Sequence, residues 1–174
     1  MNKFFSYLIL CFLISLSSAK ACDFKKIQYG EKTQDLTLNI FAPTFKDNFG
    51  GEKYVVPIQE LCPENKDLFG TTINYLFIDE KLSQIFLERF GMNDTALMDF
   101  TEKKYGKIIL PQDLKREDWR GKEYWNLKDE TVTFISVNVH GGRKIEILEL
   151  TPKLYEEKVI AYAEKIGKWL DEQK

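Results

Sequence analysis

The fold is decided by the stretch Thr131-Val-Thr-Phe-Ile-Ser-Val-Asn-Val-His140, Gly141-Gly142, Arg143-Lys-Ile-Glu-Ile-Leu-Glu-Leu150. Its first part is rich in β-branched residues, and Ile135, Val137 and Val139 recur on one face, which predicts a half-buried strand. The two glycines predict a turn, because glycine accepts positive φ without steric cost. A second strand follows, with Ile145 and Ile147 on one face, so the stretch reads as a β-hairpin.

The register of this hairpin follows from matching apolar side chains. A two-residue loop would set Val139 beside Lys144, whereas a loop over residues 141–143 sets Val139 beside Ile145 and Val137 beside Ile147. The second register is favoured, since a slip of one residue turns the apolar face over. It places Arg143 third in the loop, where glycine is preferred.

A long amphipathic helix is expected directly after the hairpin. Thr151 is a good N-cap and Pro152 suits the first helical position, where its missing N–H is no loss. Apolar residues then recur at spacings of four and three: Tyr155, Val159, Tyr162, Ile166 and Trp169. We expect this helix to lie across the apolar face of the sheet.

The segment over residues 82–90 allows two interpretations. Its apolar residues fit one face of a helix capped by Asp79. They also fit a strand returning from a turn at residues 79–81, which would pair Tyr75 with Ile85 and Ile73 with Leu87. The hairpin is favoured.

The remaining pattern completes an α+β fold. The other expected elements are short strands over 24–29 and 124–127, a helix over 33–41, an edge strand over 54–61 that contains Pro57, a strand over 71–78, and a helix from Asn93 or Asp94 to Tyr105 closed by Gly106. Together they predict an antiparallel sheet of hairpins packed on one face by helices, in two layers, as a single domain over residues 22–174.

Residues 1–21 have the pattern of a secretory signal peptide: a positive start, an apolar run over residues 4–16, and small residues before the cleavage position. The apolar run is short for a membrane span, which needs about 20 residues, although a retained N-terminal anchor is the alternative. Cleavage would remove two lysines and no acid, which takes the net charge from −2 to −4. A negative net charge argues against nucleic acid as a partner. The sequence contains no second apolar run of that length, so no membrane span is expected after residue 21.

Two cysteines remain after cleavage, Cys22 and Cys62, and an even pair in an exported chain favours a disulfide. The alternative is a lipid anchor on Cys22, which directly follows the cleavage site. Lys20 argues against it, because a lipidation signal has a small residue there. Protein export to the periplasm or medium is expected in either case.

The layout resembles small exported bacterial α+β domains, namely the OmlA-type outer-membrane assembly lipoproteins and the β-lactamase inhibitory proteins. The features that carry the resemblance are Tyr29-Gly30-Glu31-Lys32-Thr33, the segment from Tyr75 to Ile85, and Lys104-Tyr105-Gly106-Lys107. The chain lacks the lipidation signal of the first group and the tandem repeat of the second. The resemblance implies a protein-binding scaffold and assigns no particular residue.

Catalytic motifs are scarce. His140 is the only histidine, and neither Ser83 nor Ser136 lies in a nucleophile-elbow motif. One histidine and two cysteines expected in a disulfide are too few for a zinc site, and no glycine loop of the phosphate-binding kind opens a helix. We therefore expect no catalytic residues, no metal and no cofactor.

The most distinctive candidates for binding lie in residues 115–125, which mix arginine, tyrosine and tryptophan, the residue types enriched at interfaces. Trp125 is expected to fill the core and Trp119 to be exposed. The candidate contacts are Arg116, Trp119, Arg120, Tyr124, His140 and Arg143.

Two functions remain open. The first is a non-catalytic domain that recognises another envelope or secreted protein, and it is favoured because catalytic motifs are missing. The alternative is an enzyme or small-ligand binder, acting on glycans or lipids, which would bring two acids together in an aromatic-lined cleft.

Overall fold

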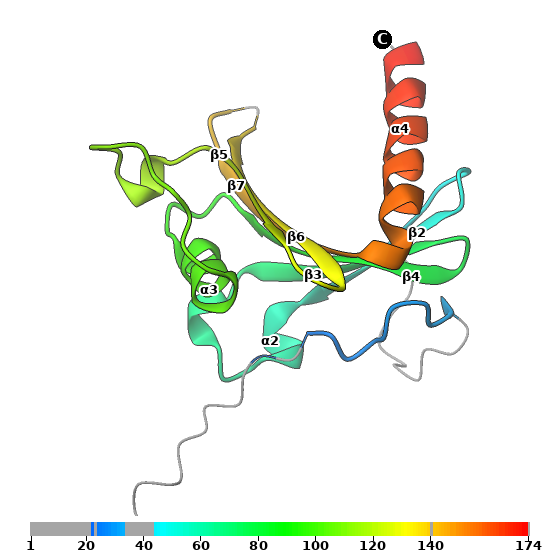
Figure 1. Cartoon of the computed structure of the whole chain (residues 1–174), viewed down its shortest axis with the longest axis horizontal. Coiled ribbons are helices and arrows are strands. Elements are labelled where there is room, and N and C mark those ends of the chain that lie inside the picture. Colours follow the sequence, from blue (N-terminus) through cyan, green and yellow to red (C-terminus); the bar gives the residue numbers. More distant parts are fainter. Residues whose placement is uncertain (1–21, 23, 34–43, 140, 174) are drawn as a thin grey trace, which may run out of the picture.

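A computed structural model describes Cys22 and residues 24–33, 44–139 and 141–173. In this part of the chain, seven strands form an antiparallel sheet in the order β1-β2-β3-β4-β7-β6-β5 (Figure 1). The strands are β1 (Phe45–Lys46), β2 (Gly51–Pro57), β3 (Thr71–Ile78), β4 (Lys81–Phe90), β5 (Gly121–Asn126), β6 (Glu130–Asn138) and β7 (Lys144–Pro152). The helices are α2 (Ile58–Leu61), α3 (Ala96–Tyr105) and α4 (Glu156–Glu172), with 3₁₀ turns at Lys66–Leu68, Arg116–Asp118 and Lys153–Tyr155. The expected signal peptide and, except for Thr33, the expected helix over 33–41 lie outside the described residues.

β3 and β4 form the hairpin that the sequence favours for residues 71–90. Tyr75 lies opposite Ile85 and Ile73 opposite Leu87, the register predicted from the sequence. The turn uses Asp79 and Glu80 at positive φ, 50° and 65°. Both residues are exposed, and the aspartate is of the type that tolerates this region best.

β6 and β7 form the second hairpin, but its predicted register is wrong by two residues. Val137 lies opposite Ile145 and Ile135 opposite Ile147, and the Val139 N–H donates to the Arg143 oxygen at 2.9 Å. In this register the turn ends at Gly142, directly before Arg143, with φ of 82° at Gly141 and 73° at Gly142. The favoured register kept Val opposite Ile but placed Arg143 in the glycine position, which is why the chain does not adopt it.

The core lies on the other face of these strands from the one predicted. Val132, Phe134, Leu148 and Leu150 are completely buried, whereas Val137 is 39% exposed. Both faces of β6 and β7 carry apolar side chains, so alternation alone did not reveal which face is covered. The covering elements are α3 and the N-terminal segment, which lie on the same side of the sheet in Figure 1.

The N-terminal segment packs as an irregular chain, and the strand predicted over residues 24–29 does not form. Phe24 and Ile27 are buried in the core, and the Tyr75 hydroxyl donates to the Phe24 carbonyl at 2.7 Å. A disulfide joins Cys22 to Cys62. Side-chain burial and this covalent link hold its first part, and an antiparallel bridge between Lys32 and Lys81 joins its end to the start of β4.

The predicted edge strand over residues 54–61 divides into β2 and α2. Pro57 ends β2 opposite Thr72, and α2 begins at the next residue. β2 has an edge neighbour of two residues, β1, so the proline lies where a missing N–H disrupts no ladder. α3 ends at Tyr105, and Gly106 follows with φ of 116°, as the sequence predicted.

α4 neither starts nor lies where the sequence predicted. Thr151 and Pro152 belong to β7, opposite Thr131 and Glu130, and α4 begins only at Glu156. The helix rises away from the sheet on the side opposite α3 (Figure 1), and none of its residues is fully buried. The predicted arrangement of helices on one face in two layers is therefore not confirmed. No helix among the described residues has both the length and the apolar character to cross a bilayer.

Candidate functional site

The face of the sheet that points away from the core, here called the outer face, carries an apolar surface. The strand register aligns its side chains in rows, with Phe90, Ile145 and Val137 in one row and Ile147 and Ile135 in the next. A third row runs from Phe86 through Glu149 and Thr133 to Tyr124. Phe90, Val137 and Tyr124 are 43%, 39% and 58% exposed.

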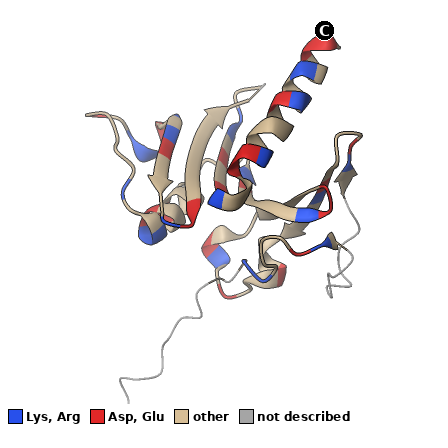
Figure 2. Cartoon of the chain, turned by 45° about the vertical axis from the view of Figure 1, so that its right-hand side comes forward, with Lys and Arg blue, Asp and Glu red and all other residues tan. Residues whose placement is uncertain are grey.

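α4 covers only one end of the outer face. Its first turns are fixed by Lys158, whose Nζ lies 2.9 Å from the Ile78 carbonyl and 2.9 Å from the Asp79 carboxylate. The Thr131 hydroxyl donates to Glu156 at 3.2 Å. Beyond these contacts the helix leaves the sheet, and Figure 2 shows both charge signs along its length. The apolar rows are therefore left open beside a projecting helix.

A groove of about 410 Å³ lies between α4 and strands β1, β3 and β4. Phe45 and Leu76 line it from the strands, and Val159, Ile166 and Leu170 line it from the helix. α4 also packs on the β1–β2 turn, where the Tyr162 hydroxyl binds Asp47 and Trp169 meets Phe49 edge-on at 6.3 Å. The groove extends the apolar surface toward the helix.

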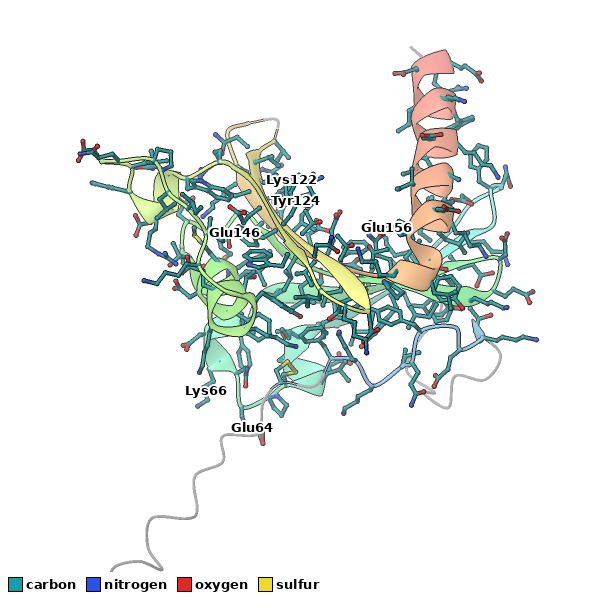
Figure 3. The ribbon with its side chains drawn as sticks, in the orientation of Figure 1. Glu64, Lys66, Lys122, Tyr124, Glu146 and Glu156 are labelled. Carbon is teal, nitrogen blue, oxygen red and sulfur yellow. A yellow bond between two sulfur atoms is a disulfide. The ribbon has the colours of Figure 1, made fainter. Side chains whose placement is uncertain are left out.

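Charged side chains interrupt the outer face. Glu88 and Lys122 flank the row that contains Ile147 and Ile135, and Glu149 lies in the row that begins at Phe86. Glu149 is half-buried between Phe86 and Thr133, and loss of water around it raises the pKa of its carboxyl group, while Lys122 acts in the opposite direction. The Lys122 Nζ lies 4.7 Å from the centre of the Tyr124 ring. Figure 3 shows both of these β5 side chains on the side of the sheet from which α4 rises.

A separate group of charges is buried on the core side. Arg89 holds Asp94 through two contacts, at 2.8 and 2.6 Å, and Lys144 lies 2.6 Å from Glu146 and donates to the Asp94 carbonyl at 3.1 Å. Burial raises the pKa of the Glu146 carboxyl group, and Lys144 opposes that change. Lys144 and Glu146 are 2% exposed. We therefore assign this group of charges the structural role of connecting β4, β7 and the segment before α3, and not contact with a substrate.

A second cavity, of about 860 Å³, lies at the N-terminal end of α3 and is lined by Glu64, Asp67, Asp94 and Asp99 beside Phe100. Asp94 is held by Arg89, and Asp99 lies 2.5 Å from Arg116. The Arg89 hydrogen bond holds the pKa of Asp94 below its ordinary value, which suits an anion and not a general acid. No cluster of three metal-ligating side chains occurs within the described residues.

Trp119, predicted to be exposed, is buried at 5% exposure, and that prediction is wrong. Its indole stacks on Phe134 with ring centres 5.9 Å apart, and its carbonyl accepts from Ser136 at 3.0 Å. Gly121 permits this arrangement, because a Cβ there would lie 2.7 Å from the indole. The charged neighbours of Trp119 in the sequence suggested exposure, but the segment folds back over β5 and β6. Trp125 is half-buried and packs against the core.

The two arginines beside Trp119 contact the protein itself. Arg116 binds Asp99 and Glu102, and Arg120 donates to Asn138 at 2.6 Å and to the Trp119 carbonyl at 2.8 Å. Both side chains are fixed by these contacts and lie apart from the apolar rows.

Tyr124 and Arg143 are the predicted contacts that the structure brings to the outer face. Tyr124 ends the third row, and the Arg143 guanidinium lies 4.6 Å from the centre of the Phe90 ring. His140 lies outside the described residues. The sequence reasoning missed Phe86, Phe90 and Glu149 as surface residues. The sequence did contain a signal for them, because β4 and β7 carry apolar residues on both faces and a single core covers only one face.

Comparisons with protein-family models, with curated proteins and with solved structures gave no significant match.

Proposed function

We propose that this chain is an exported, non-catalytic domain that binds another envelope or secreted protein through the outer face of its sheet. No cofactor is needed for this role. The Cys22–Cys62 disulfide supports export, because such bonds persist in oxidising compartments. The layout resemblance to β-lactamase inhibitory proteins favours the same kind of role.

The observation that carries the proposal is the open set of apolar rows on β4, β7, β6 and β5. An antiparallel sheet with one face in water normally has polar side chains on that face. Here Phe90, Val137 and Tyr124 are exposed beside half-buried isoleucines. A contiguous exposed apolar surface is typical of an interaction site, and Tyr124 and Arg143 are of the types enriched at binding hot spots.

The test compares two matched substitutions. Val137→Asp places a charge in the apolar rows at a position that is already exposed. Ile109→Asp is the control, because Ile109 is an aliphatic residue that is 81% exposed on the loop after α3. Tagged wild type and both variants are captured from the native host after chemical crosslinking. The proposal expects a specific protein to be recovered with wild type and Ile109→Asp and lost with Val137→Asp. Equal recovery with all three would contradict it.

A further inference from the structure

Glu149 is a carboxylate within an apolar surface. Phe86 lies opposite it on β4 and Thr133 opposite it on β6, while Ile147 precedes it on the same face of β7. Among the described residues, its carboxylate makes no hydrogen bond or ion pair. Lys122 is the charge that acts on it, and that ammonium group lies over the Tyr124 ring.

A second acid lies next to it. Glu88 on β4 is half-buried on the same face, opposite Ile147 and Thr72. The register makes Glu88 and Glu149 diagonal neighbours, a pair of positions about 7–8 Å apart. One cationic group placed between them could contact both carboxylates.

Two lysines on this side of the sheet have other contacts, and the first, Lys122, lies over the Tyr124 ring. Lys158 is held by Asp79 and the Ile78 carbonyl at the foot of α4. The Gln84 amide donates to Thr151 at 3.0 Å instead of to Glu149. A partner that covered the outer face with apolar groups alone would remove water from Glu149 without replacing it, which opposes binding.

We infer that the partner is a protein that presents a lysine or arginine, flanked by apolar side chains, to Glu149 and Glu88. The apolar flanks match the isoleucines and Phe86, and the cation replaces the water that the carboxylates lose. Because Glu149 and Glu88 disfavour a purely apolar partner surface, the two carboxylates also contribute to specificity. This inference rests on the proposed function and names the chemistry of its partner.

A peptide library tests the inference directly. Random dodecamers displayed on phage are selected on the purified, disulfide-bonded protein, and clones that still bind Val137→Asp are discarded. Affinities of the remaining peptides are then measured for wild type, Glu149→Gln and Glu64→Gln. Glu64 is the matched control, since it is exposed on the side of the molecule opposite Tyr124 (Figure 3).

The inference expects the selected peptides to be enriched in a basic residue between apolar ones. It expects Glu149→Gln to weaken their binding by at least about tenfold, as for loss of one partner of a desolvated charge pair, and Glu64→Gln to leave it unchanged. Val137-dependent peptides without a basic residue, peptides insensitive to Glu149→Gln, or no Val137-dependent peptides would each overturn it. The host crosslinking result would remain valid in those cases, so failure of the inference is distinguishable from failure of the proposed function.

Discussion

Val137 on β6 lies directly opposite Ile145 on β7, on the face of the sheet that points away from the core. This pairing follows from a turn that ends at Gly142, with Gly141 and Gly142 both at positive φ. It adds an aliphatic pair to the row that Phe90 completes on β4. The turn chemistry of the hairpin thus fixes which side chains lie opposite one another on the proposed binding surface.

The turn itself can be tested by replacing glycine with alanine. Gly142→Ala should lower the free energy of unfolding by about 1 kcal/mol, because alanine is strained at positive φ. Gly167→Ala is the opposite case, since this glycine lies in α4 with open space around it, and it should gain about 1 kcal/mol. Urea denaturation of both variants gives the comparison. A stabilised Gly142→Ala protein would contradict the assigned turn.

Trp119→Ala should be strongly destabilising because the indole is buried against Phe134. Removing a large core aromatic typically costs about 3–5 kcal/mol. Tyr124→Ala, at a residue that is 58% exposed, should change the free energy of unfolding by less than about 0.5 kcal/mol. Chemical denaturation followed by circular dichroism measures both. A change of similar size in the two variants would contradict the burial of Trp119.

The disulfide should account for a large part of the stability. Cys22 and Cys62 are 40 residues apart, and closing a loop of that length stabilises the folded state by about 4 kcal/mol in the chain-entropy model. The Cys22→Ala/Cys62→Ala protein should therefore unfold at a clearly lower urea concentration than oxidised wild type. Reduced wild type serves as the control and should match the double variant. Identical midpoints for oxidised and reduced wild type would show that the bond contributes nothing.

The free energy of unfolding should fall in acid because Asp94 becomes protonated. Its hydrogen bond from Arg89 lowers its folded-state pKa, so the carboxylate stabilises the fold above its unfolded pKa, and this contribution is lost as the pH falls through the folded value. The unfolded pKa of aspartate is about 3.9, so the loss occurs below about pH 4. Asp94→Asn should be less stable than wild type at pH 7. The difference in their free energies of unfolding should become smaller below about pH 4. A constant difference in the free energy of unfolding between Asp94→Asn and wild type over this pH range would contradict the assignment.

Local pairing was predictable where one solution satisfied both turn and side-chain chemistry. Tyr75 opposite Ile85 follows from a short polar turn between two apolar runs, and the Cys22–Cys62 bond follows from the number of cysteines. The sequence also contained the signal for the correct register of β6 and β7, namely the preference of the turn for glycine in its last position. The predicted register relied instead on matching Val with Ile, which both registers satisfy.

The identity of the outer face was not predictable for a physical reason. In β6, Phe134 points into the core and Ile135 points outward, yet both are apolar. Which face is covered depends on where α3 and the N-terminal segment pack, and those contacts are long-range. Trp119 was missed for the same reason, since its burial depends on Phe134 and on the missing side chain at Gly121.

The most direct test of the binding surface is a photo-crosslinking side chain introduced at Val137 in the native host, with Ile109 as the matched position. Both residues are aliphatic and exposed, and only Val137 lies on the outer face. The account predicts one discrete protein adduct from position 137 after illumination and none of that mass from position 109. No adduct at position 137, or the same adducts at both positions, would contradict the claim that the outer face binds a protein.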